Sequence, residues 1–251
     1  MTNVWDSGNA SSHITLSGAN LTATAGGPGV PNSQGEVRST PVITSGGGDF
    51  WYAEIYATNT YSASPPSSYP WSNSPNRIGI FESAEPISNS AIPGNGPNSW
   101  VVAIGGTIQF AVHNSTNAAI LNQTANSSVT IMLAVDTNSN QLWLGIDGTW
   151  FTGDPGTLTS PTWTSVTGSL YFGAELISPP SGPGQSSPYE AYATLNAGGS
   201  PFAYSIPHGF GTLDHSSSVT GTTAQTLSVL RQTIAGKDGA LSRRYNSWRN
   251  K

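Results

Sequence analysis

Two tight turns within one short stretch, Val129 to Pro155, constrain the fold of this chain most strongly. The stretch opens with an apolar run, Val129 to Val135, which is typical of a buried strand. A polar turn follows, and then a second apolar run, Leu142 to Ile146. Asp147-Gly148 provides the strongest short signal for a hairpin, because both turn positions tolerate positive φ. The stretch therefore predicts a β-meander, with the rest of the chain forming the other walls of a β-sandwich.

The composition predicts a surface with few charged residues and a core of ordinary aromatic content. Charged residues make up 8% of the 251 residues, against about 25% in ordinary soluble domains. Ser, Thr, Asn and Gly take their place, while eight Trp, nine Tyr and seven Phe supply bulk for a core. The chain contains no cysteine, which excludes disulfides and thiolate metal sites. This composition predicts a folded protein that works outside a cytoplasm or on a particle.

Targeting and membrane signals are missing from the sequence. Residues 1–5 contain no basic region and no apolar run, so we expect no signal peptide. No apolar stretch approaches the ~18 residues that a membrane-spanning helix needs. We therefore expect no membrane insertion.

Four long segments rich in Pro, Gly or Asn separate the predicted strands, namely 57–76, 85–99, 114–128 and 178–188. Connections of this length tend to be functional or disordered. Aromatic residues in or beside them are the candidate ligand-binding residues, because aromatic faces next to Asn and Ser suit sugar or protein surfaces. These candidates are Tyr61, Tyr69, Trp71 and Tyr189. The alternative is that Tyr69 and Trp71 fold back and cover the sheet.

The chain changes character after Leu213. We expect the sandwich over residues 1–213, a Ser/Thr/Gly-rich linker over 214–223 and a basic C-terminal arm over 224–251. Apolar residues recur in the arm at helical spacing, so we expect a short helical or extended arm that is not stable alone. The residues expected to bind an assembly partner are Leu227, Leu230, Ile234, Arg243, Arg244 and Trp248.

No catalytic set can be recognised in the sequence. Glu54 stands alone on its predicted strand, whereas glycoside cleavage needs two carboxyl groups about 5–9 Å apart. Asp136, Asp147 and Asp154 fall in turns, where Asp bonds the local backbone. The four His residues share no metal-ligand spacing, and no Gly-x-Ser-x-Gly elbow occurs. We therefore expect a non-enzymatic protein with no catalytic residue, cofactor or metal.

The large aromatic residues outside the long loops have the pattern of core residues. We expect Trp51, Trp100, Trp143, Trp150 and Phe202 to pack in the core. Residues 1–213 contain no base-stacking platform with interleaved Lys and Arg, so nucleic-acid binding by the sandwich is not expected. Nucleic-acid binding by the basic arm stays open, and a steep salt dependence would be its mark.

Several short motifs, taken in order, resemble those of the SPRY (B30.2-like) domain family. They are Phe50–Ile55, Arg77–Ile80, Val129–Pro155, Tyr171–Ala174, Thr194–Gly198, Pro201–Tyr204 and Pro207–Phe210. The resemblance spans about residues 5 to 213. It implies an all-β, antiparallel two-sheet sandwich of the concanavalin A-like type. It also implies a binding module rather than an enzyme, with ligands held by variable loops gathered at one edge.

Resemblance and composition together predict a structural protein of a bacteriophage virion, such as a decoration, fibre, tail or baseplate component. We expect a homo-oligomer on the particle surface that contacts other virion proteins through its C-terminal arm and binds a host-surface glycan or protein. The alternative is a lectin-like carbohydrate- or protein-binding module of a bacterium. An intracellular adaptor of the eukaryotic SPRY type fits less well, because Lys and Glu are scarce.

Overall fold

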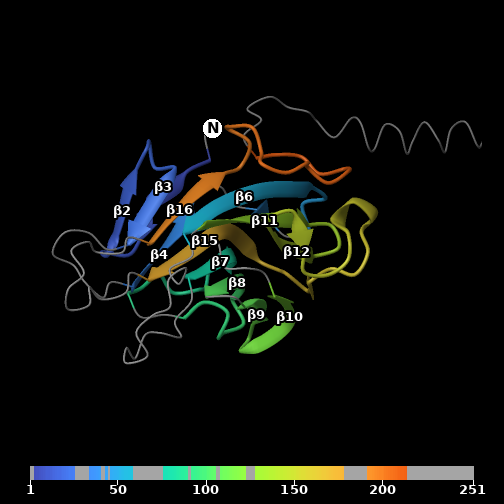
Figure 1. Ribbon diagram of the computed structural model, residues 1–251, viewed down its shortest axis with the longest axis horizontal. Helices are drawn as coiled ribbons and strands as arrows, with labels where there is room; N and C mark the ends of the chain where they lie inside the picture. The colour runs from blue at the N-terminus through green and yellow to red at the C-terminus, as the bar shows by residue number, and fades with distance from the viewer. Residues whose placement is uncertain are drawn as a thin grey trace, which may run out of the picture. The chain divides into compact units, whose positions relative to one another are not determined.

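The computed structural model describes residues 3–25, 34–40, 43–44, 46–58, 76–89, 92–105, 108–122, 128–177 and 191–213. These residues form two antiparallel sheets, which we name sheet A and sheet B (Figure 1). The helix content of this part of the chain is a single 3₁₀ turn, η1 (Pro155–Thr157). The expectation of an all-β, antiparallel two-sheet sandwich is therefore confirmed.

Sheet A combines strands from both halves of the chain. Its order is β1 (Trp5–Ala10), β4 (Gln34–Ser39), β15 (Ser169–Ile177), β7 (Asn76–Glu82), β8 (Ser99–Gly105), β9 (Ile108–His113) and β10 (Thr116–Asn122), and β5 (Ile43–Thr44) also pairs with β15. The late strand β15 lies between the early strands β4 and β7.

Sheet B has the meander at one side and the N-terminal hairpin at the other. Its order is β13 (Thr149–Trp150), β12 (Gln141–Ile146), β11 (Ser128–Asp136), β6 (Phe50–Thr58), β16 (Ala191–Asn196), β3 (Thr22–Ala25) and β2 (Ile14–Ser17), and β14 (Trp163–Thr164) also pairs with β12. β6 and β11 pair along their whole lengths. These two strands form the centre of the sheet.

The meander of β11, β12 and β13 confirms the prediction for Val129 to Pro155. At its second turn, Asp147 and Gly148 have φ values of 46° and 83°, as a two-residue type I′ turn requires. At its first turn, the Asp136 carboxylate accepts the backbone N–H of Asn138 at 2.8 Å. The local turn chemistry therefore sets the register of the meander, as the sequence indicates.

The main core lies between the two sheets, because alternate residues of each central strand point inward. Ile131 and Leu133 of β11 belong to this core together with Phe172 and Leu176 of β15, and all four are fully buried. The intervening residues of these strands point to the outer faces of the sandwich. Those outer faces carry the features described below.

The five aromatic residues expected in the core all pack against hydrophobic clusters, but they divide between two of them. Trp100 is buried between the sheets, and the half-buried Trp51 packs against the same core. Trp143 is fully buried in a second cluster, on the outer face of sheet B. Trp150 and Phe202 are half-buried against that second cluster.

The prediction of a loop over 114–128 is wrong in part. Residues 116–122 form β10, which pairs with β9. Asn114 and Ser115 connect the two strands with φ values of 49° and 58°. Two consecutive positive values allow a two-residue hairpin turn, and Asn is one of the residues that tolerates this conformation. The Asn-rich composition therefore concealed a hairpin.

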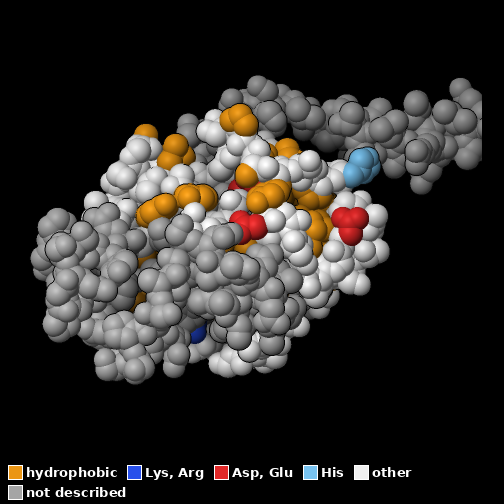
Figure 2. Space-filling view, in the orientation of Figure 1, with side chains coloured by type: hydrophobic (Ala, Val, Ile, Leu, Met, Phe, Trp, Pro, Cys, Tyr) orange, Lys and Arg blue, Asp and Glu red, His pale blue; other side chains and the backbone are white. Residues whose placement is uncertain are grey.

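The predicted linker and arm, residues 214–251, lie outside the described residues, so this division of the chain stays a prediction. Among the described residues, no helix is long and apolar enough to cross a membrane. Figure 2 shows that charged side chains are sparse on the described part of the visible face. This sparseness matches the low charged fraction of the sequence.

Candidate functional site

The outer face of sheet B carries a row of side chains that the strand register sets side by side. Tyr56 of β6 lies opposite Thr130 of β11 and opposite Thr194 of β16. Thr194 lies opposite Thr22 of β3, and the hydroxyl oxygens of these two residues are 3.0 Å apart. We name these four residues the Tyr56 row. The row points away from the core, because the neighbouring Ile55 points into it.

One end of this face is covered by the last described segment, residues 197–213. Phe202, Tyr204 and Phe210 of this segment pack onto the cluster that contains Tyr52 and Trp143. The rings of Tyr52 and Phe202 meet edge to face, with centroids 5.0 Å apart at an interplanar angle of 72°, a favourable geometry for aromatic pairs. This end of the face is therefore closed.

Glu54 fastens the covering segment to the sheet. Its carboxylate accepts the backbone N–H groups of Ala203 at 2.8 Å and Tyr204 at 2.9 Å. It also accepts the hydroxyl of Tyr52 at 2.8 Å. Burial, together with this hydrogen bond, raises the pKa of Tyr52, which keeps the phenol protonated as a donor. Both oxygens of the buried Glu54 are therefore engaged in holding the fold together.

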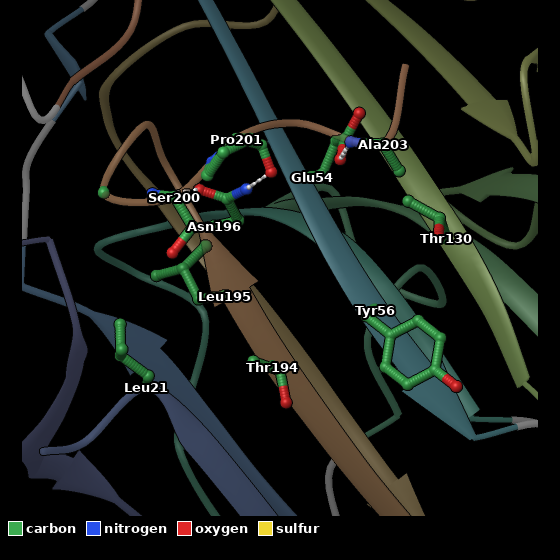
Figure 3. Close-up of a pocket in the computed structure, with 11 residues that line it drawn as sticks. Leu21, Glu54, Tyr56, Thr130, Thr194, Leu195, Asn196, Ser200, Pro201 and Ala203 are labelled. Carbon is green, nitrogen blue, oxygen red and sulfur yellow. Dashed lines mark hydrogen bonds between the residues drawn. The ribbon is translucent and has the colours of Figure 1, made fainter. Parts of the chain in front are cut away.

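A groove of about 340 Å³ opens next to the covering segment (Figure 3). Tyr56, Thr130 and Thr194 line it from the strands, and Ser200 and Pro201 line it from the covering segment. Asn196 donates to the Pro201 carbonyl at 3.2 Å and so fixes this side of the groove. The volume lies within the range of about 300–1,000 Å³ that is usual for ligand pockets.

The ring of Tyr56 is held in one orientation but stays accessible. Its hydroxyl donates to Ser128 Oγ at 2.6 Å. The Tyr192 ring lies 6.0 Å away, centroid to centroid, with an interplanar angle of 37°. Even so, Tyr56 is 43% exposed. The groove therefore presents a fixed aromatic surface bordered by hydroxyl groups.

The outer face of sheet A differs sharply, because it buries charged side chains. Glu175 of β15 lies opposite Glu36 of β4 and opposite Arg77 of β7. We name these three residues the Glu175 row. Arg77 Nε lies 3.8 Å from Glu175 Oε2, and Gln34 donates to Glu175 Oε1 at 2.6 Å. Glu36 and Glu175 are almost fully buried, and like charges placed opposite each other on a sheet are destabilising.

The connection between β7 and β8 is tied to this charged face. The hydrogen bonds run from Arg38 Nη1 to the Ser83 carbonyl (3.0 Å), from Arg77 Nη1 to the Pro93 carbonyl (3.1 Å) and from the Ser88 amide to Glu36 Oε2 (3.2 Å). Ile87 of the connection packs on an apolar patch that includes Phe81 and Val101. These buried side chains therefore hold the connection between β7 and β8 in place by hydrogen bonds.

Burial controls the protonation of this row. It raises the pKa of Glu175 to about 8, although Arg77 acts in the opposite direction. It also raises the pKa of Glu36 to about 7, and the negative charge of Glu85 adds to the rise. The pKa of Glu85 itself is raised by burial. Burial therefore favours the protonated form of the carboxyl groups in this row, which relieves the repulsion between them.

The residues that the sequence singled out for binding lie outside the described part of the chain. These are Tyr61, Tyr69, Trp71 and Tyr189 of the loops and Leu227, Leu230, Ile234, Arg243, Arg244 and Trp248 of the arm. Their roles stay predictions. Among the described residues, no group of three or more His, Asp or Glu side chains has an arrangement that could hold a metal ion.

Sequence reasoning missed Tyr56, although a signal was present. Tyr56 belongs to an alternating pattern in β6. In this pattern Ala53, Ile55 and Ala57 point into the core. Tyr52 and Tyr56 alternate with these residues and therefore point to the outer face. Tyr52 has the covering segment, whereas Tyr56 remains exposed.

Solved structures provide the comparison that decides the fold. The TRIM65 PSpry domain is similar to this chain with a TM-score of 0.50 and 15% identity, over 78% of this chain and 90% of that chain. The fold is SPRY-like. The SPRY domain of human HERC1 has a TM-score of 0.49 and 12% identity, over 76% of this chain and 96% of that chain. Stonustoxin has a TM-score of 0.46 and 12% identity, over 78% of this chain and 27% of that chain.

Sequence comparisons add no closer relationship to this structural likeness. No protein-family model matches the chain, and no curated protein matches its sequence. The SPRY resemblance of the motifs is therefore supported at the level of the fold.

Proposed function

We propose that this chain is a non-enzymatic binding module carried on the surface of a bacteriophage particle, as a decoration, fibre, tail or baseplate component. The groove beside Tyr56 carries the binding part of this proposal, because it offers an oriented, exposed ring among hydroxyl groups. The SPRY-like fold supports the binding part of the proposal by analogy, and not the location on a particle. The lone carboxylate of Glu54 is already engaged in structural hydrogen bonds, which fits a module without catalysis.

Composition supports the particle surface as the location. The chain has 8% charged residues, no cysteine and many Ser, Thr, Asn and Gly residues, which suits a surface exposed outside a cell. The basic arm, residues 224–251, is the proposed attachment segment. Its positive charge would pair with an acidic groove on another virion protein, and its apolar residues would fill adjacent pockets. Several copies of the chain would then assemble around that partner.

A protein inventory of purified particles tests this proposal. We expect the full chain to co-purify with particles at a fixed copy number, measured by quantitative mass spectrometry. A chain truncated after Leu213 should keep the sandwich and lose its association with particles. Recovery of the full chain only in the free fraction of the lysate would rule out the virion role.

A lectin-like module of a bacterium is the second candidate, and the groove itself favours it. Its exposed Tyr56 ring is bordered by the hydroxyl groups of Thr130, Thr194 and Ser200, a combination that suits a sugar. Binding of a glycan by the isolated protein, combined with its absence from particles, would favour this candidate over the first.

A further inference from the structure

The charge distribution around the groove limits the ligands that it can bind. Arg38 and Arg77 are the only Lys or Arg residues before Arg231, and both are engaged on the outer face of sheet A. Among the described lining residues, the one acidic side chain is Glu54, which already accepts three hydrogen bonds. Among the lining residues that the structure describes, an anionic ligand finds no cation to pair with, and a cationic ligand finds no free carboxylate.

The groove offers the two kinds of contact that remain. The first is the apolar face of Tyr56, whose position is fixed by its bond to Ser128 before any ligand arrives. The second is a set of hydroxyl groups on Thr130, Thr194 and Ser200. A hydroxyl group both donates and accepts hydrogen bonds, so it matches ligands that do the same. A fixed ring also reduces the entropy lost on binding.

We propose that this groove binds a neutral saccharide, with the C–H face of a sugar ring on Tyr56 and the sugar hydroxyls paired with Thr130 and Thr194. The inference rests on the proposed binding function and names its ligand class. Neutral sugars combine an apolar C–H face with hydroxyl groups of mixed donor and acceptor character. The groove, at about 340 Å³, has room for a small saccharide.

The test uses the full chain on an array that carries both neutral and acidic glycans. We expect binding to neutral members, and the strongest of these is then titrated by calorimetry against four proteins. These are the wild type, Tyr56→Ala, Tyr56→Phe and Leu158→Ala. The last is a control at an exposed apolar residue that does not line the groove. Thermal unfolding of each variant confirms that it is folded.

The expected result is a loss of affinity of about tenfold or more for Tyr56→Ala, because the stacking surface is removed. Tyr56→Phe retains the ring face and should stay within about threefold of the wild type. Leu158→Ala should bind as the wild type does. This pattern would establish the groove as the sugar site.

Three outcomes would overturn the inference while leaving a binding module in place. They are neutral-glycan binding that Tyr56→Ala does not weaken, binding restricted to acidic glycans, and binding of host-surface protein with no glycan bound. Failure to bind any glycan or host protein, together with absence from particles, would overturn the proposed function itself. The two failures are thus distinguishable.

Discussion

The two outer faces of the sandwich handle polar groups in opposite ways. Sheet A places Glu36, Glu175 and Arg77 in one cross-strand row and closes a loop over them. Sheet B covers one end of its outer face with an aromatic segment and leaves the ring of Tyr56 exposed beside it. Charge is therefore buried on one face, and uncharged hydroxyl and aromatic groups are presented on the other.

This contrast explains where the few charged residues of the chain act. Both Arg residues of the first 230 residues are tied to backbone carbonyls of the connection between β7 and β8. Neither is available to attract an anionic partner to the sandwich. The structure of sheet A thus depends on buried ionisable side chains, whereas recognition on sheet B is expected to depend on an aromatic face and hydroxyl groups.

The largest effect is expected at Glu54, which separates the covered half of sheet B from the open half. Glu54→Ala removes the acceptor for two backbone N–H groups and one phenol, all in a buried position. We expect a loss of roughly 4 kcal/mol in the free energy of unfolding, measured by urea denaturation. Glu54→Gln keeps one acceptor oxygen and should lose less. If Glu54→Ala unfolds at the same urea concentration as the wild type, the hydrogen bonds of Glu54 are not needed to keep the covering segment on the sheet.

An intermediate effect is expected at Glu175, and it depends on pH. The folded state raises the pKa of Glu175 to about 8 from an ordinary value of 4.5. The folded protein therefore binds this proton more tightly than the unfolded chain does. As the pH rises from 5 to 9, the free energy of unfolding should fall, because ionisation of the buried carboxyl favours the unfolded chain.

The variant Glu175→Gln isolates this contribution, since it cannot ionise. We expect its stability to match the wild type near pH 5 and to exceed it by at least about 2 kcal/mol near pH 9. Urea midpoints at pH 5, 7 and 9 measure the difference. Glu36, Glu85, Arg38 and Arg77 surround the same site and remain in both proteins. Parallel pH profiles for the two proteins would contradict the assignment.

The smallest effect on stability is expected at Tyr56. Tyr56 lies on the same strand and face as Glu54, but the tyrosine is 43% exposed. We expect the free energy of unfolding to change by less than about 1 kcal/mol. A large loss in the same urea assay would mean that Tyr56 supports the sheet, and the contrast between the two halves of this face would disappear.

Local signals predicted much of the fold. Asp147-Gly148 fixes the second turn of the meander, and the side chain of Asp136 accepts a backbone N–H in the first. Each of these turns depends on residues that are adjacent in sequence, so the sequence displays them directly. The hairpin at Asn114 and Ser115 uses the same chemistry, but its Asn-rich surroundings are also typical of a loop.

The groove and the charged row could not be predicted, because both depend on strand register between distant segments. Glu54 bonds Ala203 across 149 residues of sequence, and Gln34 bonds Glu175 across 141. Nothing local to Glu54 indicates that its carboxylate is engaged in this way. Tyr56 likewise becomes a site only because Thr130 and Thr194 lie on either side of it.

The pairing of early strands with late ones also determines when this chain can fold during synthesis. β4 lacks its neighbour β15, and β3 lacks its neighbour β16, until residues 169–196 have left the ribosome. The indole N–H of Trp5 donates a hydrogen bond to the carbonyl of Ala193, 188 residues later, at 3.1 Å, so this bond also forms only after β16 is made. Such non-local pairing slows folding and leaves strand edges exposed in the meantime. The nascent protein should therefore depend on protection by chaperones until the last strand is made.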